Sequence, residues 1–134
     1  LVDKVMALKS VDLFSTVPAE DLVHVARVAH ERNFAAGSTM FEEGDRPGPL
    51  YLVLEGRVGL RRGRMAAGEI PAGSPVGTLS LFDDQPRSHT AYALEDVRAL
   101  VVEREDFYDV LAENVEVLRS LVGNLLHRLQ GLAV

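Results

Sequence analysis

The chain has 134 residues, 47% of them hydrophobic and 25% charged, which is typical of one globular domain with a single core. Its formal net charge of −6 disfavours binding to nucleic acids and anionic membranes, so an anionic ligand would need a local site. The absence of cysteine excludes disulfides, thiolate metal sites and thiol nucleophiles.

No apolar run in the sequence approaches the roughly 18 residues of a membrane-spanning helix. The chain begins at Leu1 without a signal-peptide pattern. We therefore expect a piece of a longer protein that resides in the cytoplasm, or on the cytosolic face of a larger membrane-associated protein.

The first 30 residues predict two helices. Residues 2–9 have a short amphipathic pattern, and Pro18 is placed to open a second helix. In that second helix the apolar residues recur at i, i+3, i+4 and i+7, which predicts one buried face made of Leu22, Val25, Ala26 and Ala29.

Turn residues dominate the middle of the chain. Nine of the eleven glycines fall between Gly37 and Gly77, and five of the six prolines between Pro47 and Pro86. The segments between them predict strands at 31–34, 39–41, 50–55, 57–61, 64–70, 89–94 and 98–103. Such spacing favours a small β-sandwich or barrel. Three arginines, Arg61, Arg62 and Arg64, fall at a predicted hairpin tip, either as a solvated turn or as a contact for a partner domain.

A helical period returns at Arg104. A short helix is predicted over 106–111, and Asn114 is placed to cap a longer one. The apolar side of the longer helix exceeds what one packing partner covers and comprises Val115, Leu118, Leu121, Val122, Leu125, Leu126, Leu129 and Leu132. This helix either pairs with a second copy in a homodimer or folds back on its own domain.

Residues 77–91 predict an anion site. Gly77 opens a short apolar turn, whose free backbone N–H groups attract anions. Arg87 follows ten residues later and is placed to hold a phosphate with two parallel hydrogen bonds. The competing interpretation is a surface arginine, solvated or paired with Asp83 or Asp84.

Taken together, these motifs resemble the cyclic nucleotide-binding domain. The resemblance covers about 13–111 and rests on Leu13-Phe14, Phe41-x-x-Gly44-Asp45, a central hairpin at 50–58 with Gly56 at its turn, Gly73-x-x-x-Gly77, and Gln85-Pro86-Arg87-Ser88. It implies an α+β, mainly β fold: an eight-stranded jelly-roll-type β-barrel flanked by N-terminal helices and two C-terminal helices. The single domain of residues 1–134 would then comprise helices in 1–30, the barrel in 31–103 with the phosphate-binding cassette 77–91, and helices in 104–132.

The resemblance also implies a site and a function. Its ligand-binding residues would be Gly77, Thr78, Leu79, Ser80, Arg87 and Ser88, with Arg87 on the cyclic phosphate and Ser88 touching it. The ligand would be cAMP, cGMP or a related phosphate, and no cofactor is implied. The C-terminal helix would pass a conformational change to an attached or partner effector domain outside these residues, without direct nucleic-acid binding here.

An enzyme is not expected. The four histidines, His24, His30, His89 and His127, lack metal-ligand spacing, and no nucleophile elbow or P-loop is present. We expect each histidine to lie at the surface or to make a single hydrogen bond.

The sequence departs from the family at one ligand position. The family's Gly-Glu-Leu-Ala-Leu places a glutamate on the ribose 2′-OH, whereas this chain has Thr78 there. A charged hydrogen bond contributes about 1.5–3 kcal/mol and a neutral one about 0.5–1.5 kcal/mol, so nucleotide affinity would fall roughly ten- to a hundredfold. The alternative function is therefore a degenerate domain that acts in docking or structure without binding nucleotide.

Overall fold

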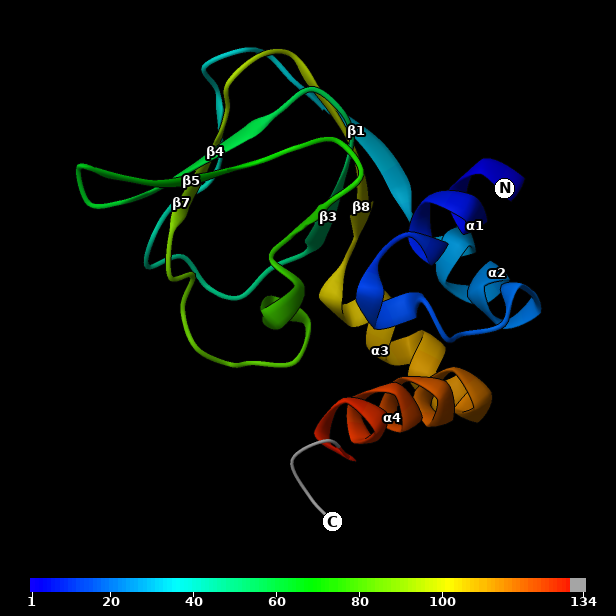
Figure 1. The fold of residues 1–134 in the computed structure, drawn as a ribbon. Helices are drawn as coiled ribbons and strands as arrows, with labels where there is room; N and C mark the ends of the chain where they lie inside the picture. The colour runs from blue at the N-terminus through cyan, green and yellow to red at the C-terminus, as the bar shows by residue number, and fades with distance from the viewer. Residues whose placement is uncertain (131–134) are drawn as a thin grey trace.

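The computed structural model describes residues 1–130, which form eight strands in two antiparallel four-stranded sheets with helices gathered at one end (Figure 1). The sheets have the orders β1-β8-β3-β6 and β2-β7-β4-β5. The strands are β1 His30–Phe34, β2 Thr39–Phe41, β3 Leu50–Glu55, β4 Val58–Arg62, β5 Met65–Ile70, β6 Pro75–Val76, β7 Thr90–Ala93 and β8 Val97–Val102. This confirms the predicted mainly β, jelly-roll-type fold.

Strand β6 is the one strand that has no counterpart among the predicted segments. It has two residues and begins with Pro75, which lacks an N–H for a sheet ladder. It nevertheless pairs with the middle of β3, with Val76 opposite Tyr51. Its pairing partner, rather than its own sequence, therefore makes it a strand.

The predicted central hairpin at 50–58 is wrong, because β3 and β4 belong to different sheets. Gly56 carries the chain across between them in a left-handed conformation, with φ +89°. A Cβ at residue 56 would lie 2.3 Å from the carbonyl oxygen of Asp96. Glycine is required here for a sheet-to-sheet crossing against neighbouring backbone.

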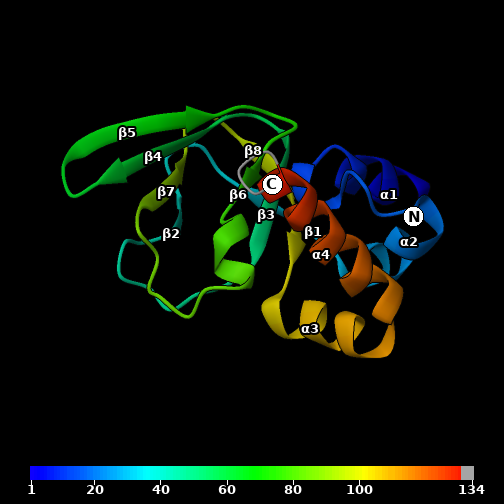
Figure 2. The same cartoon turned by 60° about the horizontal axis from the view of Figure 1, so that its bottom comes forward.

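The β4–β5 pair is the hairpin that does form, with the arginine-bearing tip predicted from the sequence. It projects away from the helices, at the left of Figure 2, and Gly63 turns its tip with φ +60°. The Arg61 guanidinium lies 5.3 Å from the Tyr92 ring centre, and Arg62 Nε donates to the carbonyl of Ser88 at 3.4 Å. The end of β4 next to this tip thus lies beside the cassette.

The helices gather at one end of the sandwich (Figure 1). They are α1 Val2–Lys9, the short 3₁₀ turn η1 Asp12–Phe14, α2 Ala19–Val28, α3 Arg104–Glu113 and α4 Val115–Gln130. Helix α4 is packed on α2, α3 and η1. The predicted buried face of α2 is confirmed, since Leu22, Val25 and Ala26 are fully buried. Carboxylates in the first turns of α2 and α3 suit the helix dipole.

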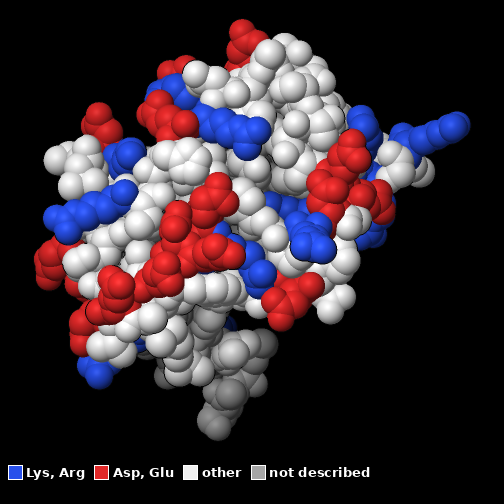
Figure 3. All heavy atoms as spheres, turned by 180° about the vertical axis from the view of Figure 1, so that it is seen from behind, with Lys and Arg blue, Asp and Glu red and all other residues white. Residues whose placement is uncertain are grey.

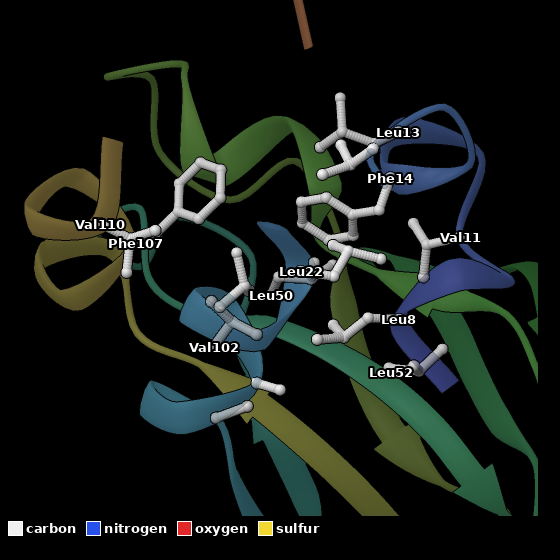
Figure 4. Packing of buried hydrophobic residues seen from close by; sticks show 14 of the residues in the cluster. Leu8, Val11, Leu13, Phe14, Leu22, Leu50, Leu52, Val102, Phe107 and Val110 are labelled. Carbon is white, nitrogen blue, oxygen red and sulfur yellow. The ribbon is translucent and has the colours of Figure 1, made fainter. Parts of the chain in front are cut away.

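Strands β3 and β8 contribute to two separate hydrophobic clusters. Leu50, Leu52, Leu100 and Val102 pack with the helices, around Phe14 and Phe107 (Figure 4). The intervening residues of the same strands face the interior of the sandwich, where the second cluster includes Tyr51, Val53, Val97, Ala99 and Val101. Alternation along a strand places successive side chains on opposite faces. One sheet therefore separates two cores and contributes to both.

Helix α4 is held on the N-terminal segment by a buried polar anchor. Asn124 is 7% exposed, and its Nδ2 donates to the carbonyls of Asp12 at 2.9 Å and Leu13 at 3.2 Å. Val117 and Leu121 beside it are buried. Leu121 belongs to the predicted apolar stripe and Val117 does not. The other described residues of that stripe are exposed: Val115, Leu118, Val122, Leu125, Leu126 and Leu129. Leu132 lies outside the described residues.

Asn114 differs from its predicted role as a cap for the long helix. Its Nδ2 donates to the carbonyl of Val110 at 3.0 Å, so its side chain satisfies the end of α3. Its backbone N–H also bonds to Val110, at 2.8 Å. The residue closes one helix at the junction with the next.

The surface carries interspersed charges, as the face in Figure 3 shows. Arg98 on β8 joins its two neighbouring strands, pairing with Glu31 at 2.8 Å and Glu55 at 3.0 Å. These groups are partly exposed, so each pair contributes little, typically about 0–1 kcal/mol. Among residues 1–130, no helix is long and apolar enough to cross a membrane.

Candidate functional site

The guanidinium of Arg87 is buried inside the barrel, with the residue only 5% exposed. Its Nη1 donates to the Ser80 hydroxyl at 2.9 Å and its Nη2 to the carbonyl of Pro49 at 2.8 Å. The guanidinium centre lies 4.0 Å from the centre of the Phe41 ring, a cation–π contact. The side chain is thus fixed in position by neutral groups.

The backbone around Arg87 is fixed as well. Its N–H donates to the carbonyl of Asp45 at 2.8 Å, and its own carbonyl accepts from the N–H of Gly44 at 2.9 Å. These two bonds tie the cassette to the turn after β2. The Gly44-Asp45 motif and the Arg87 motif, which lie far apart in the sequence, are therefore in direct contact.

The charge of Arg87 has no carboxylate partner among residues 1–130. Asp84 pairs instead with Arg104, at 2.8 Å, and the Asp83 carboxylate accepts the N–H of Gln85 at 3.0 Å. The interpretation of a surface arginine paired with Asp83 or Asp84 is therefore wrong. Burial lowers the pKa of the Arg87 guanidinium, and the Coulombic attraction of Tyr51 and Asp45 opposes this. A buried cation without a counter-ion is costly, and an anion would relieve that cost.

Gly77 allows the guanidinium to lie across the cassette. It adopts φ +84°, and a Cβ at this residue would lie 2.3 Å from Arg87 Nη1. Both the backbone conformation and the close approach therefore need glycine. The turn that follows, η2 Thr78–Leu81, is a 3₁₀ helix of four residues.

A cavity of about 220 Å³ opens beside this guanidinium. Its floor is apolar, with Phe41, Leu60, Ile70 and Val76, and its cassette side contributes Gly77, Leu79, Ser80, Asp83, Gln85, Pro86, Arg87, Ser88 and His89. An apolar surface facing a few polar groups around one cation suits a ligand with a flat apolar part and an anionic part.

Five of the six predicted site residues meet at this cavity: Gly77, Leu79, Ser80, Arg87 and Ser88. Thr78 does not. It lines a second cavity of about 430 Å³ between the cassette, η1 and α4, together with Leu13, Ser74 and Arg128. The side chain at the family's glutamate position is therefore not among the groups that line the arginine cavity.

Sequence reasoning missed the apolar floor and His89. Phe41 had a signal, since it belongs to a quoted motif, and its ring stacks on Tyr51 with centres 6.1 Å apart. His89 directly follows Ser88, and its Nδ1 lies 2.7 Å from the Ser88 Oγ. Among residues 1–130, no group of three or more His, Cys, Asp or Glu side chains is arranged to hold a metal ion.

The two-sheet jelly roll, its terminal helices and its arginine-bearing cassette define the class of cyclic nucleotide-binding domains. Residues 31–114 match the family model described as "Cyclic nucleotide-binding domain", and the chain belongs to this family.

Known relatives agree with this class. The chain is 30% identical over 128 residues to the cyclic AMP receptor protein of Thermus thermophilus, covering 92% of this chain and 59% of that protein. It is 27% identical to the cGMP-dependent 3′,5′-cGMP phosphodiesterase A of Dictyostelium discoideum, covering 90% of this chain and 14% of that enzyme. The chain thus spans less than two thirds of these curated relatives.

A solved structure matches nearly the whole chain. The N-terminal domain of a transcriptional regulator from Streptomyces coelicolor superposes with a TM-score of 0.86 at 30% identity, covering 95% of this chain and 94% of that one.

Proposed function

We propose that this domain is a regulatory sensor that binds a cyclic nucleotide, cAMP or cGMP, or a related phosphate, and passes a conformational change to an effector domain outside these residues. Arg87 and Ser88 hold the phosphate, and the apolar floor of the cavity accepts the base. Ser80 keeps Arg87 in place. A cytoplasmic location belongs to the same proposal.

The observation that carries this proposal is the buried guanidinium of Arg87, which meets only neutral partners and borders a cavity. Its two hydrogen bonds use two of the five N–H groups that an arginine offers. Within residues 1–130, the other three have no hydrogen-bond partner. A phosphate in the cavity would accept these N–H groups in charge-assisted bonds.

The proposal is tested by titration calorimetry with cAMP and cGMP. We expect saturable binding, and Arg87→Ala should abolish it because, among residues 1–130, Arg87 is the one arginine or lysine that lines the cavity. Arg57→Ala is the matched control, since Arg57 is exposed and pairs with Glu69 and Glu95 on the outer surface. No heat and no thermal shift with either nucleotide at high micromolar concentration would refute the sensor function.

Contacts between the cassette and α3 give the signal a route. The Tyr108 hydroxyl donates to the carbonyl of Leu81, and Arg104 Nη2 bonds to the Asp84 carboxylate at 2.8 Å. The Phe82 and Phe107 rings meet edge to face at 5.8 Å. A ligand that moves η2 would therefore move α3, and a shift follows only if the ligand binds the two positions with different affinity.

The exposed apolar side of α4 supports association with a second copy. Leu118, Val122, Leu125, Leu126 and Leu129 are each at least 40% exposed on one helix. Burial of such a face is favourable by about 25 cal/mol per Å² of apolar surface. A homodimer through α4 is therefore part of the proposed function.

The second candidate is a domain of this fold that docks or supports a partner without nucleotide. The placement of Thr78 outside the arginine cavity favours it, because the residue at the ribose-acceptor position of the family pattern does not line that cavity. It predicts that partner association is indifferent to nucleotide and to Arg87→Ala. A nucleotide-dependent change in that association would exclude it.

A further inference from the structure

Ser88 and His89 form a hydrogen-bonded pair at the cavity. The Ser88 Oγ and the His89 Nδ1 are 2.7 Å apart, and both residues line the cavity that Arg87 borders. Ser88 is exposed and His89 is half-buried, so solvent reaches the pair. Neither residue is buried in a core, and the pair is free to respond to a ligand.

The direction of this hydrogen bond decides what Ser88 offers to an anion. When Nδ1 carries no proton, it accepts the Ser88 O–H, and the hydroxyl presents only lone pairs to the cavity. When the imidazole is protonated, Nδ1 donates to Oγ, and the hydroxyl proton is free to bond to a phosphate oxygen. The neutral tautomer with its proton on Nδ1 also donates to Oγ, so it is in the Nε2–H tautomer that protonation of His89 converts Ser88 from an acceptor into a donor toward the ligand.

The charges around His89 make this protonation depend on the ligand. Arg87 shares the cavity, and Arg62 of β4 bonds to the Ser88 carbonyl, so two cations lie close to the Ser88–His89 pair. Asp83 also lines the cavity, with its carboxylate bonded to the Gln85 N–H. Glu43 contacts Thr90, the residue after His89, through a hydrogen bond from its backbone N–H to the Thr90 hydroxyl. An incoming anion adds the negative charge that favours the imidazolium.

We infer that His89 is a positioning residue of the anion site: binding of a phosphate-bearing ligand is coupled to uptake of one proton by His89, which turns the Ser88 hydroxyl toward the phosphate. The proton comes from solvent and is carried on Nδ1. The inference rests on the proposed function and adds a regulation to it, namely that acidification strengthens binding.

The test is calorimetry of the 134-residue protein with cAMP, whose phosphodiester keeps one negative charge throughout this pH range. We expect at least about fivefold tighter binding at about pH 6 than at about pH 8, the lower end of typical coupling between two sites. Repeating the titration in buffers of different ionisation enthalpy should reveal net proton uptake on binding.

His89→Gln keeps a hydrogen-bonding side chain but cannot take the charge. We expect it to bind cAMP with the affinity of the wild type at high pH, without pH dependence or histidine-linked proton uptake. Ser88→Ala should weaken binding and reduce the effect of pH. His30→Gln is the matched control, because His30 is an exposed histidine on β1, in the other sheet, and should leave the pH profile unchanged.

The outcomes distinguish a failure of the His89 coupling from a failure of the sensor function. Wild-type binding that is equal at both pH values and takes up no proton would overturn the role of His89 and leave the sensor function standing. A pH profile that survives in His89→Gln would overturn it equally. Absence of cAMP and cGMP binding at every pH would overturn both proposals.

Discussion

The Nη1 atom of Arg87 lies 2.3 Å from the position that a Cβ on residue 77 would take. Gly77 and Arg87 therefore share one space, which only a residue without a side chain leaves free. The glycine that opens the cassette and the arginine near its end form a single structural unit, although ten residues separate them along the chain.

Gly77→Ala is expected to displace the guanidinium and to strain the backbone. A left-handed alanine costs about 1–2 kcal/mol, and the new methyl group would push Arg87 away from Ser80 and Pro49. Both the free energy of unfolding and cAMP affinity should therefore fall, as measured by denaturant titration and calorimetry.

The control is Gly37→Ala, which has nearly the same φ, +85°, with nothing within 4 Å of its Cβ position. Its free energy of unfolding should fall by a similar amount from backbone strain, while its nucleotide affinity should be unchanged. Equal affinity losses in the two variants would contradict the shared-space argument.

Arg87→Met is expected to separate binding from stability. Removal of the cation should weaken cAMP binding about a hundredfold or more, because two charge-assisted bonds of about 1.5–3 kcal/mol each are lost. The free energy of unfolding should change by only about 1 kcal/mol, since a buried charge without a counter-ion is also removed. Leu81→Ala, at a fully buried residue, should instead cost about 2–5 kcal/mol. A comparable loss in Arg87→Met would indicate a structural arginine.

Tyr108→Phe is expected to weaken communication between the cassette and α3. It removes the hydroxyl that bonds to Leu81 and to Arg104, a loss of about 1 kcal/mol. Hydrogen exchange of the α3 amides should then respond less to cAMP than in the wild type. Tyr92→Phe makes the same chemical change on β7 and should leave the response intact. An undiminished response in Tyr108→Phe would exclude this route.

Asn124→Ala is expected to loosen α4 from η1. It leaves the carbonyls of Asp12 and Leu13 without their donor in a buried place, which costs about 1–3 kcal/mol. Denaturant unfolding measures the loss, and exchange of the α4 amides locates it. Arg119→Ala, at an exposed residue of the same helix, should be neutral. Unchanged exchange in α4 would show that Asn124 does not anchor it.

Leu126→Glu is expected to weaken self-association, because it places a charge on the exposed apolar side of α4, where Leu126 is 60% exposed. Sedimentation over a concentration series should show a dimer in the wild type and a monomer in the variant. Met6→Glu makes the matched change at a 69% exposed residue of α1 and should leave the dimer unaffected. A wild-type protein that stays monomeric at all concentrations would refute the α4 dimer.

The sequence allowed prediction wherever local pattern and tertiary structure agree. The apolar period of α2 marks its buried face, and the alternation of glycine and proline with short apolar segments marks most of the strands. Strand β6 is not predicted by the sequence because its pairing with β3 is a long-range contact that Pro75 and Val76 do not encode by themselves. The prediction of a hairpin at 50–58 is wrong because a glycine between two strand segments gives the same sequence pattern whether the strands pair or belong to different sheets.

The site was only partly predictable, for a related reason. Spacing brings Gly77 and Arg87 into one cassette, but the direction of a side chain within a 3₁₀ turn is set by the packing around it. Thr78 therefore could not be placed from the sequence, and His89 gave no metal or catalytic pattern that would have drawn attention to it.

The sheet that contains β3 and β8 has a consequence for how the molecule comes apart. Its alternate side chains serve the helical cluster on one face and the sandwich interior on the other. Unfolding of either the helices or the sandwich would expose one face of the same two strands to water. We therefore expect heat or denaturant to melt barrel and helices in one all-or-none transition, with the same midpoint by near-UV and far-UV circular dichroism.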